Sequence, residues 1–335
     1  MREPWFTRDG ELPVSVSMAR TWLRCPRLFW YQYVLRKEAV DAGTAPQDFG
    51  TCGHAGLASW WYEGGDDIGR LQRALAAARA QPVYSNLTKA ARLSLRAVLT
   101  AYHAAYKREG WEVLEVESKH KMILHEARGI WLRLTPDAIA RNLETGEVWV
   151  VEHKFTSADI RPGSYYWDQK DIDLQNGVYV LAAQAMGHNV EGVLYDVVKR
   201  PGYRLRKATP KAKRQYYKRD GKYGKRGDPK PGTLLEDESE SDFLDRVIDS
   251  IVADPNAFLQ RKEYRLLEED IEAAGEDIVG VARLIQGAGK AGLYPRNPDG
   301  CKRFNRVCEY YPVCAGQASI DDESMYRTRE QRRKK

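Results

Sequence analysis

Apolar side chains recur at helical spacing through the first hundred residues. In residues 15–35 they follow Ser15, a residue type that caps helix N-termini, and Pro26 interrupts them. We expect two short helices hinged at Pro26. The same spacing predicts three further helices, over residues 47–61, 68–80 and 87–108. The N-terminal part of the chain is therefore expected to be mostly helical.

From Trp111 the apolar period changes to two, which is typical of strands. We interpret three alternating segments as strands of an antiparallel meander, over residues 113–124, 129–142 and 148–155. Residues 171–186 return to helical spacing and stop at Gly187, and residues 190–199 have the pattern of a further strand. This succession predicts an α/β core.

The remaining segments differ in composition. Two more helices are expected over residues 239–251 and 268–286, and the polar residues after Asp321 suggest a mobile tail. We divide the chain into five parts: a helical N-terminal part (1–110), a core (111–198), a basic insertion (199–232), a part with helices and cysteines (233–315) and the tail (316–335).

The composition is that of a globular protein. The chain has 335 residues, of which 43% are hydrophobic and 30% charged, and its length corresponds to about two domains or one large domain. No segment approaches the roughly 18 consecutive apolar residues of a membrane span, and the N-terminus lacks the apolar core of a signal peptide. We expect a cytoplasmic protein without a membrane partner.

Positive charge is concentrated in residues 199–232. This segment contains fourteen Lys and Arg and two Asp, a net charge of +12, whereas the whole chain has a net charge of +6. Tyr203, Tyr216, Tyr217 and Tyr223 are interleaved with the cations. Because cations neutralise phosphates and aromatic rings stack on unpaired bases, the segment favours contact with single-stranded nucleic acid. The alternative is a solvated insertion whose charge only aids solubility.

Asp137, Glu152 and Lys154 form the strongest local signal for chemistry, on consecutive strands of an expected hairpin. Strand alternation places Glu152 and Lys154 on one face. Both interrupt an apolar strand, where a charge is costly unless it is paired or bound to something. There are therefore two interpretations. Either the residues carry out chemistry, or they form salt bridges within a hairpin whose sheet has one face in water.

Two carboxylates and an ammonium group suit metal-assisted hydrolysis of a phosphodiester. Carboxylate oxygens hold Mg²⁺, and the metal polarises the phosphate and lowers the pKa of a bound water. A lysine then orients that water or stabilises developing charge.

The segment LTPDAIARNLETGEVWVVEHKFTS, residues 134–157, resembles the core of the PD-(D/E)XK nuclease superfamily in its RecB-like form, with an Asp ending one strand and Glu-x-Lys on the next. Gln175 and Tyr179 resemble the Q-x-x-x-Y helix of that group, in which positions i and i+4 share one face. Gly50 and His54, in FGTCGHAGLASW, are similar to its G-x-x-x-H helix. The elements occur in the family order.

The resemblance implies a mixed central sheet flanked by helices and a metal site. Asp137 and Glu152 would hold Mg²⁺ or Mn²⁺ together with His54 and the backbone carbonyl of His153. Without the resemblance, His54 would be interpreted as a core residue whose ring nitrogens are hydrogen-bonded within the protein. Glu117 is either an additional carboxylate of the site or an ordinary outward-facing strand residue.

The same resemblance implies roles in catalysis for three further residues. Lys154 would position the attacking water, while Gln175 and Tyr179 would orient that water or the DNA backbone.

The five cysteines predict metal ligation. An odd number in a chain without an export signal argues against a disulfide framework. Cys301, Cys308 and Cys314 lie within fourteen residues and are one ligand short of a four-coordinate site, which Cys25 could complete. Cys52 is expected to be a small core residue.

One early cysteine and three late ones resemble the iron-sulfur nucleases of the AddB type and of the CRISPR-associated adaptation type, in which four thiolates hold a [4Fe-4S] cluster that closes the domain. The six-residue gap between Cys301 and Cys308 departs from the two-residue gap of many members. Structural zinc is the alternative, since four thiolates also bind Zn²⁺.

Together these features predict a metal-dependent DNA nuclease. The resemblance implies an exonuclease acting on single strands or DNA ends in recombination, repair or phage replication. Its rivals are a catalytically idle DNA-binding or scaffold subunit of the same fold and a structure-specific endonuclease. The run GAGKAGL at 287–293 lacks the full phosphate-loop pattern, so a partner helicase would be a separate polypeptide.

Overall fold

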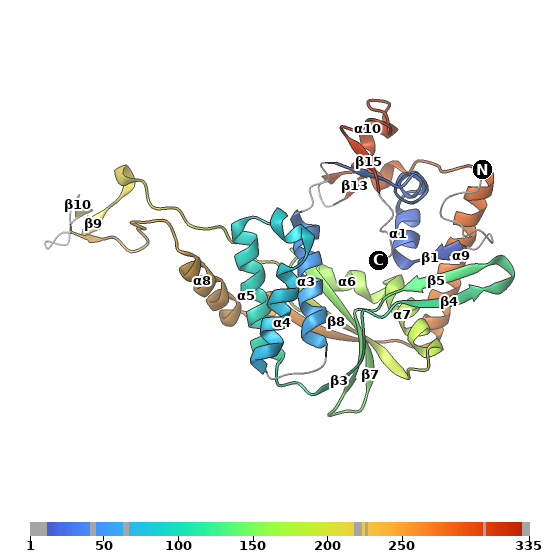
Figure 1. The fold of residues 1–335 in the computed structure, drawn as a ribbon, viewed down its shortest axis with the longest axis horizontal. Coiled ribbons are helices and arrows are strands. Elements are labelled where there is room, and N and C mark those ends of the chain that lie inside the picture. Colours follow the sequence, from blue (N-terminus) through green and yellow to red (C-terminus); the bar gives the residue numbers. More distant parts are fainter. Residues whose placement is uncertain are drawn as a thin grey trace.

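The computed structural model describes residues 12–40, 45–62, 67–217, 223–224, 227–303 and 306–329. Its centre is a five-stranded sheet of order β12-β8-β7-β6-β3 (Figure 1). Strands β7 and β8 are parallel, and the other neighbours are antiparallel. The strands are β3 (Trp111–Val116), β6 (Ala138–Asn142), β7 (Val148–Thr156), β8 (Val190–Lys199) and β12 (Leu259–Arg265). This mixed α/β architecture confirms the predicted fold class.

Helices cover both faces of this sheet because its central strands are apolar on both sides. Trp149 and Val151 of β7 pack in one core with α3 (Ala45–Trp61), α4 (Asp67–Arg79), α5 (Lys89–Tyr106) and α8 (Glu240–Ala253). Val150 lies in the core on the other face, with α6 (Tyr165–Asp171) and α7 (Leu174–Ala185). Strand alternation therefore decides which helices each side chain of β7 meets.

A second sheet of order β1-β5-β4 lies beside the first. Its strands are β1 (Leu12–Val14), β4 (His120–His125) and β5 (Ile130–Leu134). Its apolar face packs on α1 (Val16–Arg24) and α9 (Glu268–Ala291) through residues such as Leu132 and Ile278.

The predicted meander is wrong. Residues 113–124 and 129–142 each contain two strands, one in either sheet. Glu117 has a φ of 47°, which ends β3, and Pro136, which has no backbone N–H, separates β5 from β6. Periodicity shows the alternation of a strand but not the sheet to which it belongs.

Most predicted helices are confirmed. Ser15 caps α1 by accepting from the N–H of Met18 at 3.3 Å, and α2 (Pro26–Phe29) and the π-helix η1 (Trp30–Val34) follow. The predicted helix over 171–186 starts too early, because Asp173 is the N-cap of α7. Strand β12 and helix α6 were not predicted. Short 3-10 turns cover Pro82–Asn86, Glu126–Arg128, Lys211–Lys213, Pro255–Ala257 and Pro298–Cys301.

The C-terminal segment returns to the N-terminal one. Strand β15 (Tyr326–Thr328) pairs with β2 (Lys37–Ala39), and the buried ring of Tyr326 stacks on Tyr310. The expectation of a tail is therefore wrong for these residues, because an aromatic contact holds them. Residues 330–335 of that tail lie outside the described residues. Nearby are β13 (Lys302–Arg303), β14 (Arg306–Val307) and α10 (Tyr311–Cys314).

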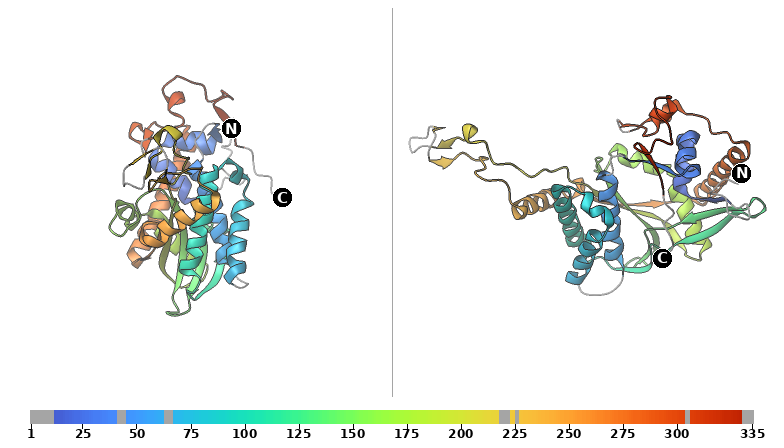
Figure 2. Two further views of the ribbon diagram at one scale, coloured as in Figure 1. Left: turned by 90° about the vertical axis from the view of Figure 1, so that its left-hand side faces the viewer. Right: turned by 45° about the horizontal axis from the view of Figure 1, so that its top comes forward.

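The basic segment leaves β8 and forms an arm that extends away from the body past α8 (Figures 1 and 2). At its base, Arg246 pairs with Glu238 at 2.6 Å, and the ring of Tyr203 packs on the core. Short strands lie along it: β9 (Tyr216–Tyr217), β10 (Tyr223–Gly224) and β11 (Asp228–Pro229). Among the helices that the structure describes, none is long and apolar enough to cross a bilayer.

Candidate functional site

Asp137 and β7 meet at one end of the β6–β7 hairpin. Asp137 lies immediately before β6 and does not end a strand, which corrects the expectation drawn from the sequence. Its Oδ2 accepts a 2.7 Å hydrogen bond from the backbone N–H of His153. This bond fixes the Asp137 carboxylate against the strand that contains Glu152.

Glu152 and Lys154 share the face of β7 that looks toward α7. The ammonium group of Lys154 donates to the Glu152 carboxylate and lies 3.5 Å from Oε1 of Gln175. The prediction that Glu152 and Lys154 lie on one face is thus confirmed, and Gln175 of α7 joins them.

His54 approaches the same carboxylate from α3. Its Nδ1 lies 3.4 Å from Oδ1 of Asp137. A glycine brings the helix this close to β7: a Cβ on Gly53 would overlap the ring of Phe155. At Gly50, the glycine of the sequence motif, a Cβ would be 3.9 Å from Phe155, an ordinary contact.

The pKa values of Glu152 and Asp137 are shifted in opposite directions. Burial, and then the negative charge of Asp137, raise the pKa of Glu152 against the opposing effect of Lys154. Burial also opposes ionisation of Asp137, but the hydrogen bond and charge of His54 hold its pKa below the ordinary value. Burial of the imidazole opposes its protonation, but the hydrogen bond to Asp137 and the charges of Asp137 and Glu152 together raise the pKa of His54. The site therefore places two carboxyl groups close together, with His54 and Lys154 beside them.

Gln175 and Tyr179 lie one helical turn apart on α7. Oε1 of Gln175 also accepts a 3.1 Å hydrogen bond from Arg20 of α1, which pairs in addition with Asp173. Burial, and then the charge of Glu152, raise the pKa of Tyr179. Sequence reasoning missed Arg20, because no local pattern indicates a contact across more than 150 residues.

A family model described as the PD-(D/E)XK nuclease superfamily matches residues 13–315. The chain belongs to the PD-(D/E)XK nuclease superfamily. No curated protein matches the chain significantly. Membership makes the chain a nuclease, an enzyme that hydrolyses phosphodiester bonds of DNA, and nucleases of this superfamily commonly use Mg²⁺ or Mn²⁺.

The donor set of this PD-(D/E)XK site fits such a metal. Two carboxylates that repel one another, with an imidazole beside them, are ligands that Mg²⁺ and Mn²⁺ accept. Within the described ranges, no group of three or more His, Cys, Asp or Glu is arranged to hold a metal ion. Asp137 is instead engaged by His54, and Glu152 by Lys154.

The imidazole of His153 faces the opposite side of the sheet from Glu152. Its Nδ1 lies 3.0 Å from Oδ2 of Asp196, and Asp196 also accepts from Tyr102 and, at 3.2 Å, from Arg261. Burial opposes ionisation of Asp196, but Arg261 and His153 hold its pKa below the ordinary value. This buried network packs against the side of β7 opposite Glu152, and no local pattern in the sequence indicates it.

Two cavities flank Lys154. One, of about 800 Å³, is lined by His54, Glu117 and Phe155 among others. The other, of about 490 Å³, lies toward Tyr165 and Tyr166. The left-handed backbone of Glu117 carries its carboxyl group to the first cavity, where burial and then the charge of Asp137 raise its pKa. A substrate can thus approach Lys154 from either side.

Of the four predicted thiol ligands, Cys25 comes from the N-terminal segment and the other three from the C-terminal one, and among the residues that the structure describes no three of them are arranged to hold a metal ion. Cys25, Cys308 and Cys314 belong to one cluster with buried tyrosines. Burial, and then the neighbouring Cys25 and Cys314 thiols, raise the pKa of Cys301, and burial raises that of Cys308 to about 11. Cys52 is fully buried in the core of α3, as expected.

Proposed function

We propose that the chain is a Mg²⁺- or Mn²⁺-dependent exonuclease of the RecB-like group that degrades DNA from single-stranded ends. The observation that carries the proposal is the meeting of Asp137, Glu152 and Lys154 with His54 and Gln175. His54 and Gln175 are residues by which the chain resembles the RecB-like group. His54 lies beside Asp137 and Gln175 beside Lys154, which belong to the motif common to the superfamily.

In this proposal Asp137, Glu152, His54 and the carbonyl oxygen of His153 hold the metal. The bound metal supplies a Lewis acid for the phosphate and lowers the pKa of a coordinated water. The carboxylate of Asp137 is already oriented by the His153 N–H at 2.7 Å, so one ligand needs little rearrangement.

Lys154 positions the attacking water. Its ammonium group donates to Glu152 and lies 3.5 Å from Oε1 of Gln175, which keeps it beside the proposed metal ligands. Hydrolysis joins the water oxygen to phosphorus and breaks the bond from phosphorus to one sugar oxygen, which leaves with a proton. Gln175, held by Arg20, and Tyr179 orient the water or the DNA backbone.

We also propose that Cys25, Cys301, Cys308 and Cys314 hold a [4Fe-4S] cluster that joins the two ends of the chain. Cys25, Cys308 and Cys314 pack in one cluster of side chains, which supports this proposal, and four thiols are a donor set that iron-sulfur clusters accept. Zinc is the alternative occupant, since it accepts the same ligands.

The decisive experiment compares linear single-stranded DNA, labelled at either end, with circular single-stranded DNA of the same sequence. We expect metal-dependent degradation of the linear strand, no cleavage in EDTA and an intact circle. The Lys154→Ala variant is the matched inactive control. A cut circle would establish an endonuclease instead. Binding without cleavage under every metal condition would establish an idle DNA-binding subunit, contradicting the proposal.

Such an exonuclease suits recombination, repair or phage replication. Strand separation would be supplied by a helicase on another polypeptide.

A further inference from the structure

One face of the β4–β5 hairpin carries exposed cations. Lys121 of β4 lies directly opposite Arg133 of β5, and Lys119 precedes β4 on the same side. The other face of the hairpin is apolar and packs in the core through residues such as Ile130 and Leu132. The cations therefore share a face that the fold leaves to solvent.

Two like charges directly opposite each other destabilise a strand pair. Among the residues that the structure describes, Lys119 and Arg133 make no ion pair that would relieve this repulsion. Lysines on an edge strand such as β4 also prevent edge-to-edge pairing, but this does not account for Arg133, because β5 is the central strand. An anionic ligand accounts for Lys119 and Arg133, beside which Lys121 lies over the ring of Trp131.

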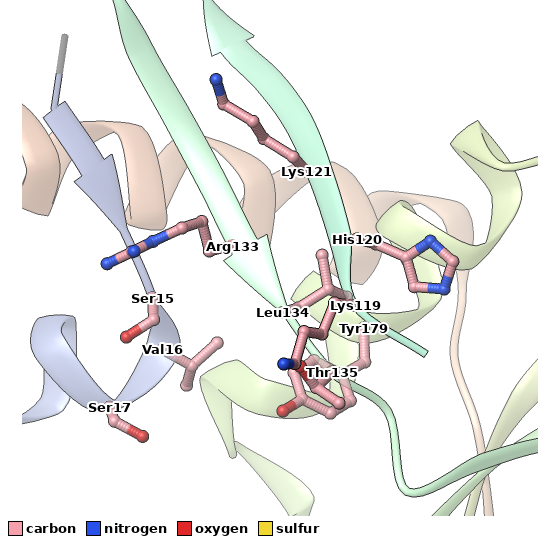
Figure 3. Close-up of a pocket in the computed structure, with 10 residues that line it drawn as sticks. All are labelled: Ser15, Val16, Ser17, Lys119, His120, Lys121, Arg133, Leu134, Thr135 and Tyr179. Carbon is pink, nitrogen blue, oxygen red and sulfur yellow. The ribbon is translucent and has the colours of Figure 1, made fainter. Parts of the chain in front are cut away.

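These cations line a cavity of about 540 Å³ between the hairpin and the start of α1 (Figure 3). In Figure 3, Arg133 extends toward Ser15, whereas Lys119 lies with Thr135 and Tyr179 at one end of the cavity. His120 points to the other side, where its Nε2 lies 2.5 Å from Glu115. The cavity thus combines cations with hydroxyl groups.

The cavity leads to the candidate catalytic residues. Tyr179 lines its inner end and lies one turn along α7 from Gln175, which contacts Lys154. On the outer part of the face, the ammonium group of Lys121 lies 3.7 Å from the ring centre of Trp131. Cations beside an aromatic face suit phosphates together with unstacked bases.

We propose that this face binds the phosphodiester backbone of single-stranded DNA and guides the strand to or from the candidate catalytic site. The inference rests on the proposed nuclease function and adds a path for the substrate. Lys119, Lys121 and Arg133 contact phosphates, and Trp131 offers a stacking surface. The path is separate from the basic arm, which lies at the opposite end of the molecule (Figure 1).

The test is binding of a fluorescent single-stranded oligonucleotide in EDTA between 50 and 300 mM salt, so that no cleavage is needed. Each phosphate contact contributes about 0.7 to the slope of log affinity against log salt. We expect the combined variant Lys119→Ala, Lys121→Ala, Arg133→Ala to lower that slope by about 2. A control with the same charge change at exposed sites elsewhere, Arg79→Ala, Arg108→Ala and Lys290→Ala, should keep the wild-type slope.

Equal slopes for the hairpin variant and the control would overturn the proposal. If the combined variant fails to fold, two other experiments test the proposal. One measures the salt slope of the single variant Arg133→Gln, and the other photo-crosslinks the oligonucleotide to wild-type protein. We expect a slope smaller by about 0.7 and a crosslink within residues 119–135. A lowered slope in a protein that cleaves no DNA would support the path and refute the nuclease proposal, and cleavage with unchanged slopes would do the reverse.

Discussion

The backbone N–H of His153 donates a 2.7 Å hydrogen bond to the carboxylate of Asp137. The bond joins the residue before β6 to the residue between Glu152 and Lys154. Because the donor is the backbone, it depends on the hairpin register and not on the histidine side chain, which contacts Asp196 on the other face. The position of Asp137 relative to Glu152 is therefore a property of the strand pair.

Lys154→Ala should abolish cleavage with little loss of folding or DNA binding. Its ammonium group acts at the site, and Glu152 can become protonated when it loses its partner, because its pKa is already raised by burial. We expect the cleavage rate to fall by about 10²- to 10⁴-fold. Lys89→Ala, at an exposed ion pair with Glu240, is the control and should keep wild-type turnover.

Asp137→Ala should also abolish cleavage, but through metal affinity. Calorimetric titration with Mn²⁺ distinguishes this variant from Lys154→Ala: the first should lose binding and the second should retain it. Near wild-type turnover of either variant would contradict the assignment of the site.

Gly53→Ala should destabilise the protein, because the new Cβ would overlap the ring of Phe155. We expect a loss of about 1–3 kcal/mol in the free energy of unfolding, with lower activity as His54 shifts. Gly50→Ala has room and should be neutral or slightly stabilising, since alanine favours helix. Urea unfolding of both variants checks this. Adding Phe155→Leu to Gly53→Ala should recover stability, whereas equal effects of the two glycine variants would refute the steric argument.

Glu152→Gln should raise the melting temperature at pH 7 in EDTA. The pKa of Glu152 is above its ordinary value of 4.5 in the folded protein, so folding favours the protonated carboxyl group. Its contribution to stability is complete below pH 4.5 and is lost as pH rises through the folded pKa. The advantage of the variant should therefore grow as the pH rises above 4.5, until it passes the folded pKa of Glu152.

Mg²⁺ should stabilise the wild-type protein more than the Glu152→Gln variant, because ligand binding to the folded state adds stability. Glu147→Gln is the control. The bond to Arg265 lowers the pKa of Glu147, so this substitution should lower the melting temperature at pH 7 instead of raising it. A melting-temperature difference between wild type and Glu152→Gln that does not change with pH would contradict the assigned electrostatics.

Anaerobically purified protein should be brown, with broad absorption near ~400 nm from thiolate-ligated iron. Replacing Cys25, Cys301, Cys308 or Cys314 by Ala should remove iron and destabilise the protein, because the cluster would close a loop of nearly the whole chain. Cys52→Ala should keep the iron content. Colourless protein with one zinc per chain would identify structural zinc instead.

Shortening the arm should weaken DNA binding without affecting the fold. The N–H of Thr209 donates to the carbonyl of Leu234 at 2.8 Å, so a short Gly/Ser linker can replace residues 210–233. We expect a smaller salt slope, by about 0.7 for each phosphate that the arm neutralises, and an increase in KM before any change in kcat. Parallel slopes for the two forms would show that the charges of the arm are only solvated.

Several elements were predictable because their signals are local. The amphipathic pattern predicts α8 and the start of α9, and Glu152 and Lys154 share a face because strand alternation requires it. The resemblance to the RecB-like group indicates His54 and Gln175, which lie beside Asp137 and Lys154. These features depend on residues a few positions apart.

The sequence by itself determined the α/β class and indicated which residues to expect at the candidate site. Only the tertiary structure decided which of two sheets receives each strand between residues 111 and 142, and which distant side chains support the site: Arg20 at Gln175, Gly53 against Phe155, and Arg261 with Asp196 behind His153. Periodicity records how a side chain alternates along its own strand or helix. The partner strand, the close approach of a helix and a buried ion pair depend on segments far apart in the chain, which meet only when the cores pack.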